Sequence, residues 1–217
     1  MRYTHVFFDL DGTLTQSEFG IIKAASYALS KFGIEEPDRD KLLRFIGPPL
    51  YYSFDKYYGV PQDKLDEAVE YFREKYDNEG YKDAPVFEGM MQVLADLKEA
   101  GADLTIVTSK PEYMADKVVK HSGLDEHFSR IVGPSVEMMS PDKADLIRRA
   151  IQVTGADPVK VLMVGDRHYD IDGAVRAGVD SIGVLYGYGT EEELKKAGAT
   201  YLAETVRDIY RIITETE

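Results

Sequence analysis

Two aspartates separated by one residue follow the first apolar run of the chain. The segment HVFFDLDGTLT reads as a buried strand that ends at Asp9 and Asp11. At the frayed end of a strand the backbone can turn both carboxylates toward one crevice, and Gly12 lets the chain bend there. An EF-hand calcium loop does not fit, because its fifth, sixth and twelfth positions would be Thr, Leu and Gly. The spacing predicts chemistry at this strand end; the plainer alternative is a strand that runs into an Asp-Gly turn.

Polar side chains also follow later strand-like runs. Thr108 and Ser109 end the run DLTIVTS, and Asp166 ends the run VLMVGD, with Asp170 four residues further on. Ligands of an open parallel sheet bind outside the carboxyl ends of its strands. We therefore expect one edge of a sheet to gather carboxylates, hydroxyls and a lysine, namely Asp9, Asp11, Thr13, Thr108, Ser109, Lys143, Asp166 and Asp170.

This set of side chains suits phosphoryl transfer. Packed carboxylates raise one another's pKa unless a cation holds them, and an all-oxygen ligand set favours Mg²⁺. One aspartate can attack phosphorus to form an aspartyl-phosphate, and its neighbour can protonate the leaving oxygen and then deprotonate water. Hydroxyls, backbone N–H groups and a lysine would hold the phosphoryl oxygens. We expect this binding role for Gly12, Thr13, Thr108, Ser109 and Lys143.

Single members of the set also have structural interpretations. Thr108 could be the polar cap of a strand, and Lys143 a solvated helix residue. Asp170 could be the N-cap of the helix that follows it. Their joint placement at three strand ends favours the functional interpretation.

The elements that must position these residues alternate between strands and helices. Apolar runs that end in turn or polar residues lie at 3–9, 103–108, 130–133, 159–165 and 180–185. Helical spacing followed by glycine occurs at 87–100, 112–122, 143–154 and 171–177. This alternation predicts right-handed βαβ units and an α/β fold with a parallel sheet covered on both faces.

One long segment interrupts the alternation. Residues 16–81 contain no good strand, only helical segments at 17–32, 40–45, 51–58 and 63–76. A segment of this size is too small to bury a large core alone, so we expect it to lean on the main domain. The predicted organisation is a catalytic core at 1–15 and 82–217 and a helical insert at 16–81.

Composition excludes several functions. The net charge of −13 with no local basic stripe argues against a nucleic-acid polymer, whereas a small anionic substrate can be held by a metal ion and a few cations. The absence of cysteine excludes disulfides, thiolate zinc sites and a cysteine nucleophile. The first apolar run is too short for a signal peptide, and no segment approaches 18 apolar residues. We expect a soluble cytoplasmic protein with no membrane partner.

In four segments the chain resembles the phosphatases of the haloacid dehalogenase superfamily. The matching segments, in the family's order, are Asp9-Leu-Asp11-Gly12-Thr13, Thr108-Ser109, Lys143 and Gly165-Asp166-Arg167-His168-Tyr169-Asp170. They span most of the chain. The lysine departs from the family pattern, because it lies in Ser140-Pro141-Asp142-Lys143 rather than the commoner Lys-Pro context.

The resemblance implies a role for each matching residue. Asp9 would be the nucleophile and Asp11 the general acid and base. Mg²⁺ would be held by Asp9, the backbone carbonyl of Asp11 and Asp166, with Asp170 in support. The resemblance also implies a Rossmann-like sheet with strand order 5-4-1-2-3 and an α-helical cap domain at the position of the insert.

Three further segments narrow the resemblance. Ile46-Gly47-Pro48-Pro49-Leu50, residues 143–147 and residues 183–189 look like the phosphoglycolate phosphatase branch, closest to its 5′-nucleotidase-like members. The expected substrate is a small phosphorylated metabolite. Gly47 either faces the substrate or lies in a turn, and Arg44 is either a contact for a second anionic group or an exposed arginine. The tyrosines of the insert either stack on a nucleobase or pack between helices, and the amphipathic pattern favours packing.

Three functions other than a phosphatase are found on the same fold. A dehalogenase has no need for a second carboxylate, so Asp11 argues against it. A catalytically dead binding protein would be expected to have lost Asp9, Asp11 or Asp166, and all three are present. A phosphosugar mutase would share every core residue and is separated only by its product. The predicted function is a Mg²⁺-dependent, 5′-nucleotidase-like phosphatase, with phosphoglycolate phosphatase or mutase as alternatives.

Overall fold

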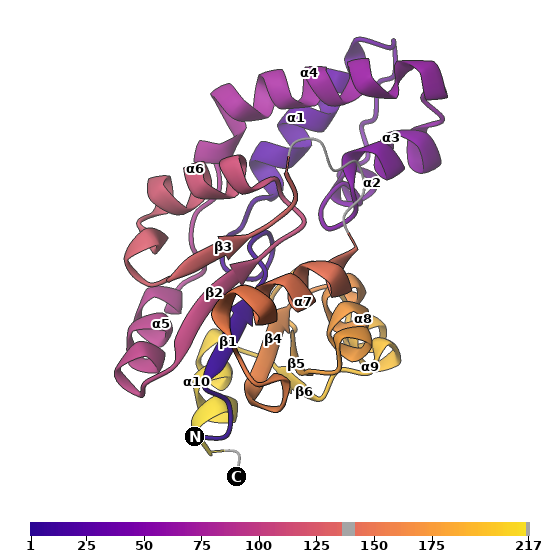
Figure 1. Cartoon of the computed structure of the whole chain (residues 1–217). Helices are drawn as coiled ribbons and strands as arrows, with labels where there is room; N and C mark the ends of the chain where they lie inside the picture. The colour runs from indigo at the N-terminus through magenta and orange to yellow at the C-terminus, as the bar shows by residue number, and fades with distance from the viewer. Residues whose placement is uncertain (136–141, 216–217) are drawn as a thin grey trace.

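The computed structural model describes residues 1–135 and 142–215. Within them, six parallel strands form one sheet in the order β3-β2-β1-β4-β5-β6, flanked by helices (Figure 1). The strands are β1 His5–Phe8, β2 Asp103–Val107, β3 Arg130–Val132, β4 Val161–Gly165, β5 Asp180–Val184 and β6 Tyr201–Ala203. Read from the β6 edge, strands β1 to β5 have the predicted order 5-4-1-2-3. The α/β fold class is therefore confirmed, and β6 extends the sheet.

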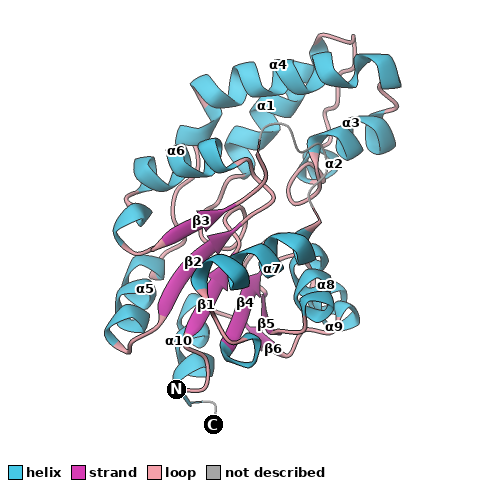
Figure 2. Ribbon diagram, viewed as in Figure 1, coloured by secondary structure: helices cyan, strands magenta, loops and turns pink. Residues whose placement is uncertain are grey.

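Both faces of the sheet are buried, as the apolar strands require. In β1, Val6 and Phe8 pack into one cluster with α5 Met90–Glu99 and α10 Val206–Glu215, while Phe7 points to the opposite cluster. That second cluster contains Met163 of β4 and apolar side chains of α7 Lys143–Thr154 and α8 His168–Ala177. The central strands thus run as continuous apolar stretches because helices cover both sides (Figure 2).

The remaining helices complete the α/β part of the chain. They are α6 Glu112–Ser122 and α9 Glu191–Ala197, with 3₁₀ turns at Leu124–Glu126 and Pro158–Lys160. Helices α6 and α7 begin and end where the sequence predicts. Their ends are sharp because Gly123 and Gly155 take positive φ values of 73° and 70°, which disfavour side chains with a Cβ. Among the described residues, no helix is both long and apolar enough to cross a membrane.

The segment between β1 and α5 is helical, as predicted. It contains α1 Glu18–Ser30, α2 Arg39–Leu43, α3 Leu50–Tyr58 and α4 Leu65–Asn78, with 3₁₀ turns at Gln62–Lys64 and Gly80–Lys82. These helices lie beyond the end of the sheet in Figure 1 and share a hydrophobic cluster that also includes Met114 of α6. Gly20 of α1 lies so close to the chain at Gly80 that a Cβ would come within 2.0 Å of the Gly80 carbonyl oxygen.

The two connections of this helical segment run side by side. The Gln16 amide donates to the Pro85 carbonyl over 2.8 Å, and the Phe87 amide donates to the Leu14 carbonyl over 3.1 Å. An isolated antiparallel bridge joins Thr15 to Val86 between them. The segment therefore enters and leaves the α/β part at one place, beside the end of β1.

Candidate active site

The turn after β1 presents two carboxylates at the edge of the sheet. The Asp9 amide donates to the Val164 carbonyl over 2.9 Å, which holds Asp9 in line with β4. The chain then turns at Gly12, whose φ is 91° and where a Cβ would lie 2.3 Å from the Asp166 carboxylate. Glycine is needed there both for its backbone conformation and for space. The turn leaves Asp9 buried and Asp11 half-buried.

Lys143 joins two of the carboxylates. Its ammonium lies 2.6 Å from Asp9 Oδ1 and 2.7 Å from Asp170 Oδ1, and the residue is only 5% exposed. Asp142 caps the start of α7 by accepting from the Ala144 amide over 2.8 Å, which places Lys143 in the first turn. Burial opposes the charge of Lys143, but the carboxylates of Asp170 and Asp9 outweigh it and hold the pKa of the ammonium above its ordinary value.

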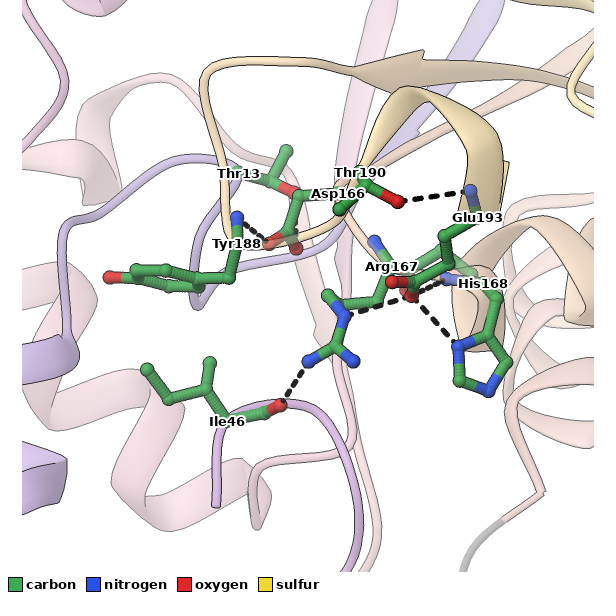
Figure 3. A network of polar contacts seen from close by, with 9 residues as sticks. Thr13, Ile46, Asp166, Arg167, His168, Tyr188, Thr190 and Glu193 are labelled. Atoms are coloured by element: carbon green, nitrogen blue, oxygen red, sulfur yellow. Dashed lines mark hydrogen bonds and ion pairs between the residues drawn. The ribbon is translucent and has the colours of Figure 1, made fainter. Parts of the chain in front are cut away.

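Asp166 completes a cluster of three buried carboxylates. Its Oδ2 accepts from the Tyr188 amide over 2.8 Å, and the Thr13 hydroxyl lies 3.4 Å from Oδ1 (Figure 3). Asp9, Asp166 and Asp170 each offer one oxygen, and these oxygens lie within 4.8 Å of one another. Burial raises the pKa of Asp9 to about 7 and raises that of Asp166 well above its usual range. The cluster therefore favours the binding of a cation that neutralises it.

The loop after β2 brings two hydroxyls and a lysine to the same place. Thr108 is buried, and its Oγ1 accepts from the Lys110 amide over 3.1 Å. The Lys110 ammonium lies 2.7 Å from Asp11 Oδ1 and 2.8 Å from the Tyr76 hydroxyl. Sequence analysis predicted Thr108 and Ser109 but missed Lys110. The available signal was its position directly after that pair at a strand end.

A second group of polar contacts surrounds the loop after β4 (Figure 3). Arg167 pairs with Glu193 of α9 at 2.9 Å and donates to the Ile46 carbonyl over 2.9 Å. The His168 amide and Nδ1 both lie within hydrogen-bond distance of Glu193 Oε1, at 2.9 and 2.8 Å. Burial opposes ionisation of Glu193, but hydrogen bonds from His168 and Arg167 lower its pKa to about 2. Glu193 thus positions Arg167 against the segment before Gly47.

A pocket separates the strand ends from the helical segment. On the sheet side it is lined by Asp9, Asp11, Thr108, Ser109, Lys110, Lys143, Arg167 and Asp170. On the other side its lining includes Ile21, Phe45, Gly47, Pro48, Pro49, Leu50, Tyr51, Val69, Phe72, Arg73, Tyr76 and the acidic Asp77. Its volume is about 130 Å³. The pocket thus has a charged floor and a largely apolar roof.

The structure brings most of the predicted site residues together. Asp166 and Thr13 lie behind the pocket floor, in contact with each other, and Gly12 packs against Asp166. Arg44 lies outside the pocket lining: it is exposed at the end of α2, 5.8 Å from the centre of the Tyr57 ring. The helix ends at this position, so the chain turns inward only after Arg44.

Arg73 is a pocket cation that sequence analysis missed. It lies on α4 and lines the roof of the pocket, half-buried. Among the described residues, no acidic side chain forms an ion pair with it. Of the eight tyrosines at 16–81, Tyr51 and Tyr76 line the pocket. Ser140 and Pro141, which precede the lysine segment, lie outside the described residues.

The chain belongs to the haloacid dehalogenase-like hydrolase family. The model of that family matches residues 6–184, which include β1 apart from its first residue, β2 to β5, and the whole set of polar residues at their ends. The resemblance drawn from the sequence motifs is therefore confirmed, and so is the prediction of a hydrolase.

Individual relatives cover almost the whole chain. A 5′-nucleotidase of Pseudomonas aeruginosa is 37% identical over 98% of this chain and 96% of its own length. Pyrophosphatase PpaX of Bacillus velezensis is 30% identical over 97% of this chain and 96% of its own. The crystal structure of a "predicted phosphatase" from Clostridium acetobutylicum is 39% identical, covers 99% of this chain and 100% of that one, and superimposes with a TM-score of 0.95.

Proposed function

We propose that this protein hydrolyses small phosphate monoesters through an aspartyl-phosphate formed on Asp9. The observation that carries the proposal is the environment of the Asp9 carboxylate. The Lys143 ammonium donates to Asp9 Oδ1, whereas none of the described residues donates a hydrogen bond to Asp9 Oδ2. Asp9 also lines the pocket. One oxygen is thus held while the other is free to attack. The names of the relatives, 5′-nucleotidase and pyrophosphatase, support reactions at phosphorus.

The reaction then divides between two aspartates. The Asp9 oxygen forms a bond to phosphorus as the bond to the leaving oxygen breaks, and Asp11 gives its proton to that oxygen. Water next attacks phosphorus and releases Asp9, while Asp11 takes a proton from the water. Thr108, Ser109 and Lys143 line the pocket, which supports a role for them in contacting the phosphoryl oxygens.

The buried carboxylates fit a magnesium ion. All their donors are oxygens, three of them lie within 4.8 Å of one another, and burial raises the pKa of Asp9 and Asp166. We propose that Asp9, Asp166 and the backbone carbonyl of Asp11 hold the ion, and that Asp170 supports the site through Lys143. When bound, Mg²⁺ would neutralise both the carboxylates and the charge of the phosphoryl group.

Magnesium should stabilise the protein more strongly as pH rises. Without metal, the raised pKa of Asp9, about 7 against an ordinary 3.8, means that the folded state binds more protons than the unfolded state between these values. The free energy of unfolding therefore falls as pH rises from about 4 to about 7. Mg²⁺ binds the deprotonated form, so the gain in melting temperature should be larger near pH ~8.5 than near pH ~6.

Thermal unfolding with chelator and with Mg²⁺ at both pH values measures this gain. Asp166→Ala should abolish it, whereas Asp145→Asn, on an exposed part of α7, should keep it. Turnover should require Mg²⁺ and be suppressed by Ca²⁺, which tolerates a higher coordination number. A gain that is absent, or larger at the lower pH, would refute the assignment, as would full activity in excess chelator.

We further propose that residues 16–81 act as a cap over the core at 1–15 and 82–217. The shared cluster of α1–α4 and the adjacent connections at Thr15 and Val86 support this division. A hinge at those connections would let the roof of the pocket move as a unit. The core residues grip only the phosphoryl group, so the choice of leaving group falls to the cap.

For the leaving group we favour nucleosides over glycolate. The roof is rich in apolar and aromatic side chains, among them Phe45, Tyr51 and Phe72, which suit stacking on a base. A cavity of about 130 Å³ has the size that holds a single aromatic ring, so the cap must open to admit a nucleotide. Arg73 supports the alternative, because a free pocket cation suits an anionic leaving group such as glycolate or phosphate.

Substrate ranking in two arginine variants tests this choice. We expect kcat/KM for AMP or GMP to exceed that for 2-phosphoglycolate and for pyrophosphate. Arg73→Ala should lower kcat/KM about tenfold for the two anionic leaving groups and less for nucleotides. The matched control Arg44→Ala removes an arginine outside the pocket and should leave every ratio unchanged. A preference for 2-phosphoglycolate that collapses in Arg73→Ala would reverse the ordering. With a hexose phosphate as substrate, an isomeric sugar phosphate instead of free phosphate would indicate a mutase.

A further inference from the structure

Lys110 lies between the candidate acid and base and the roof of the pocket. Its ammonium contacts Asp11 Oδ1 at 2.7 Å on one side and the Tyr76 hydroxyl at 2.8 Å on the other. The same ammonium lies 4.7 Å from the centre of the Tyr76 ring. The Lys110 side chain is 8% exposed and Tyr76 is 3% exposed, so water does not replace either contact.

These contacts join parts of the chain on opposite sides of the pocket. Lys110 and Asp11 follow β2 and β1, whereas Tyr76 belongs to α4. A buried ammonium must have its donors satisfied. If α4 moves away, Lys110 loses a hydroxyl acceptor and an aromatic face, and water enters beside Asp11. The partners of the Asp11 carboxylate therefore depend on the position of α4.

The two buried lysines of the site serve different carboxylates. Lys143 contacts Asp9 and Asp170, on the side of the nucleophile and the metal cluster. Among the carboxylates that the structure describes, Lys110 forms an ion pair with Asp11 alone. Its backbone amide also donates to Thr108 Oγ1 over 3.1 Å, which fixes the start of its side chain. The backbone of Lys110 is thus held in place, and its side chain pairs with Asp11.

From this geometry we infer that Lys110 is a positioning residue that couples closure of α4 to the orientation of Asp11. The inference rests on the proposed function of Asp11 as acid and base. With α4 closed, the Tyr76 hydroxyl and ring hold the ammonium so that it draws Asp11 toward the pocket. With α4 open, this support is lost and Asp11 is free to turn away. Proton transfer would then occur only when the pocket is closed over a substrate.

A second contact between the same parts of the chain supplies a matched control. The Tyr113 hydroxyl of α6 donates to Asp77 Oδ2 of α4 over 2.9 Å. Tyr113→Phe and Tyr76→Phe each remove one tyrosine hydroxyl that bridges α4 to the core. Only the Tyr76 hydroxyl contacts Lys110. Any loss that comes from weaker closure alone should appear in both variants.

The experiment compares Lys110→Met, Lys110→Arg, Tyr76→Phe and Tyr113→Phe on p-nitrophenyl phosphate and AMP with Mg²⁺. The p-nitrophenolate group leaves without a proton, so phosphorylation of Asp9 should continue when Asp11 is misplaced. The later attack of water needs Asp11 as a base. For Lys110→Met on p-nitrophenyl phosphate we expect kcat to fall about tenfold or more, KM to fall with it so that kcat/KM changes little, and a rapid burst of p-nitrophenol before slow turnover. Lys110→Arg should recover part of kcat.

Tyr76→Phe should lose more kcat than Tyr113→Phe, with a smaller burst of the same kind. A rise in KM with kcat unchanged in Lys110→Met would make Lys110 a substrate contact and overturn the inference. Equal effects of the two tyrosine variants would remove the coupling to α4. Turnover by the parent protein and its loss in Asp9→Asn establish the proposed function separately, so these outcomes bear on Lys110 alone. Melting temperatures show whether each variant is folded. Together with the recovery of kcat in Lys110→Arg, they separate a misfolded protein from a misplaced Asp11.

Discussion

Asp9→Asn should lower kcat on every phosphate ester by roughly 10⁴-fold or more while leaving the fold intact. An amide is a poor nucleophile, so the covalent step is lost. The amide oxygen can still accept from Lys143, which contacts Asp9 Oδ1 at 2.6 Å in the parent protein. Burial raises the pKa of Asp9 to about 7, so the charged form is disfavoured there, and removing that charge should not lower the melting temperature.

Steady-state kinetics and thermal unfolding together check this expectation. A mass measurement of the protein after the assay excludes conversion of the amide back to aspartate as the source of residual activity. Asp172→Asn, on the exposed side of α8, is a suitable control for replacing an aspartate near the site. Near-normal turnover by Asp9→Asn would refute the mechanism.

Asp11→Asn should lower kcat on AMP by about 10²–10⁴-fold, because proton transfer to the leaving oxygen and from water is lost. The position of the side chain should be kept, since the amide oxygen can still accept from Lys110, which lies 2.7 Å from Asp11 Oδ1. Binding of Mg²⁺ should persist, because the expected ligand at this residue is the backbone carbonyl. The thermal shift with Mg²⁺ should therefore remain while turnover falls. Full turnover, or loss of the Mg²⁺ shift, would contradict the assigned role.

The framework of the fold could be predicted from local patterns. Buried parallel strands are short apolar runs, and glycine follows the helices, so five strands and the bounds of α6 and α7 were predicted correctly. Strand β6, Tyr201–Ala203, was not predicted. Helices α9 and α10 follow β5 and were also not predicted.

The candidate site could be predicted only where it follows the strands. Asp9, Asp11 and Asp166 are placed by single strand ends, so strand prediction was sufficient to bring them together. Lys110 and Arg73 depend instead on how α4 packs over the strand ends, and no local pattern reports that packing. Arg44 is the opposite case, a residue that was predicted at the site from its place in the sequence but lies outside the pocket lining. It precedes a loop that lines the pocket, but the end of α2 leaves its side chain on the surface.

The most direct test of the account is to trap the phosphoryl group on Asp9. The Asp11→Asn protein is mixed with p-nitrophenyl phosphate and Mg²⁺, quenched in acid, and analysed by intact mass and peptide mapping. The leaving group needs no proton, while attack of water lacks its base, so the intermediate should accumulate. We predict one added phosphoryl group on the peptide that contains Asp9, and none in Asp9→Asn. A phosphoryl group on another residue, or none at all while the parent turns over the same ester, would contradict the account.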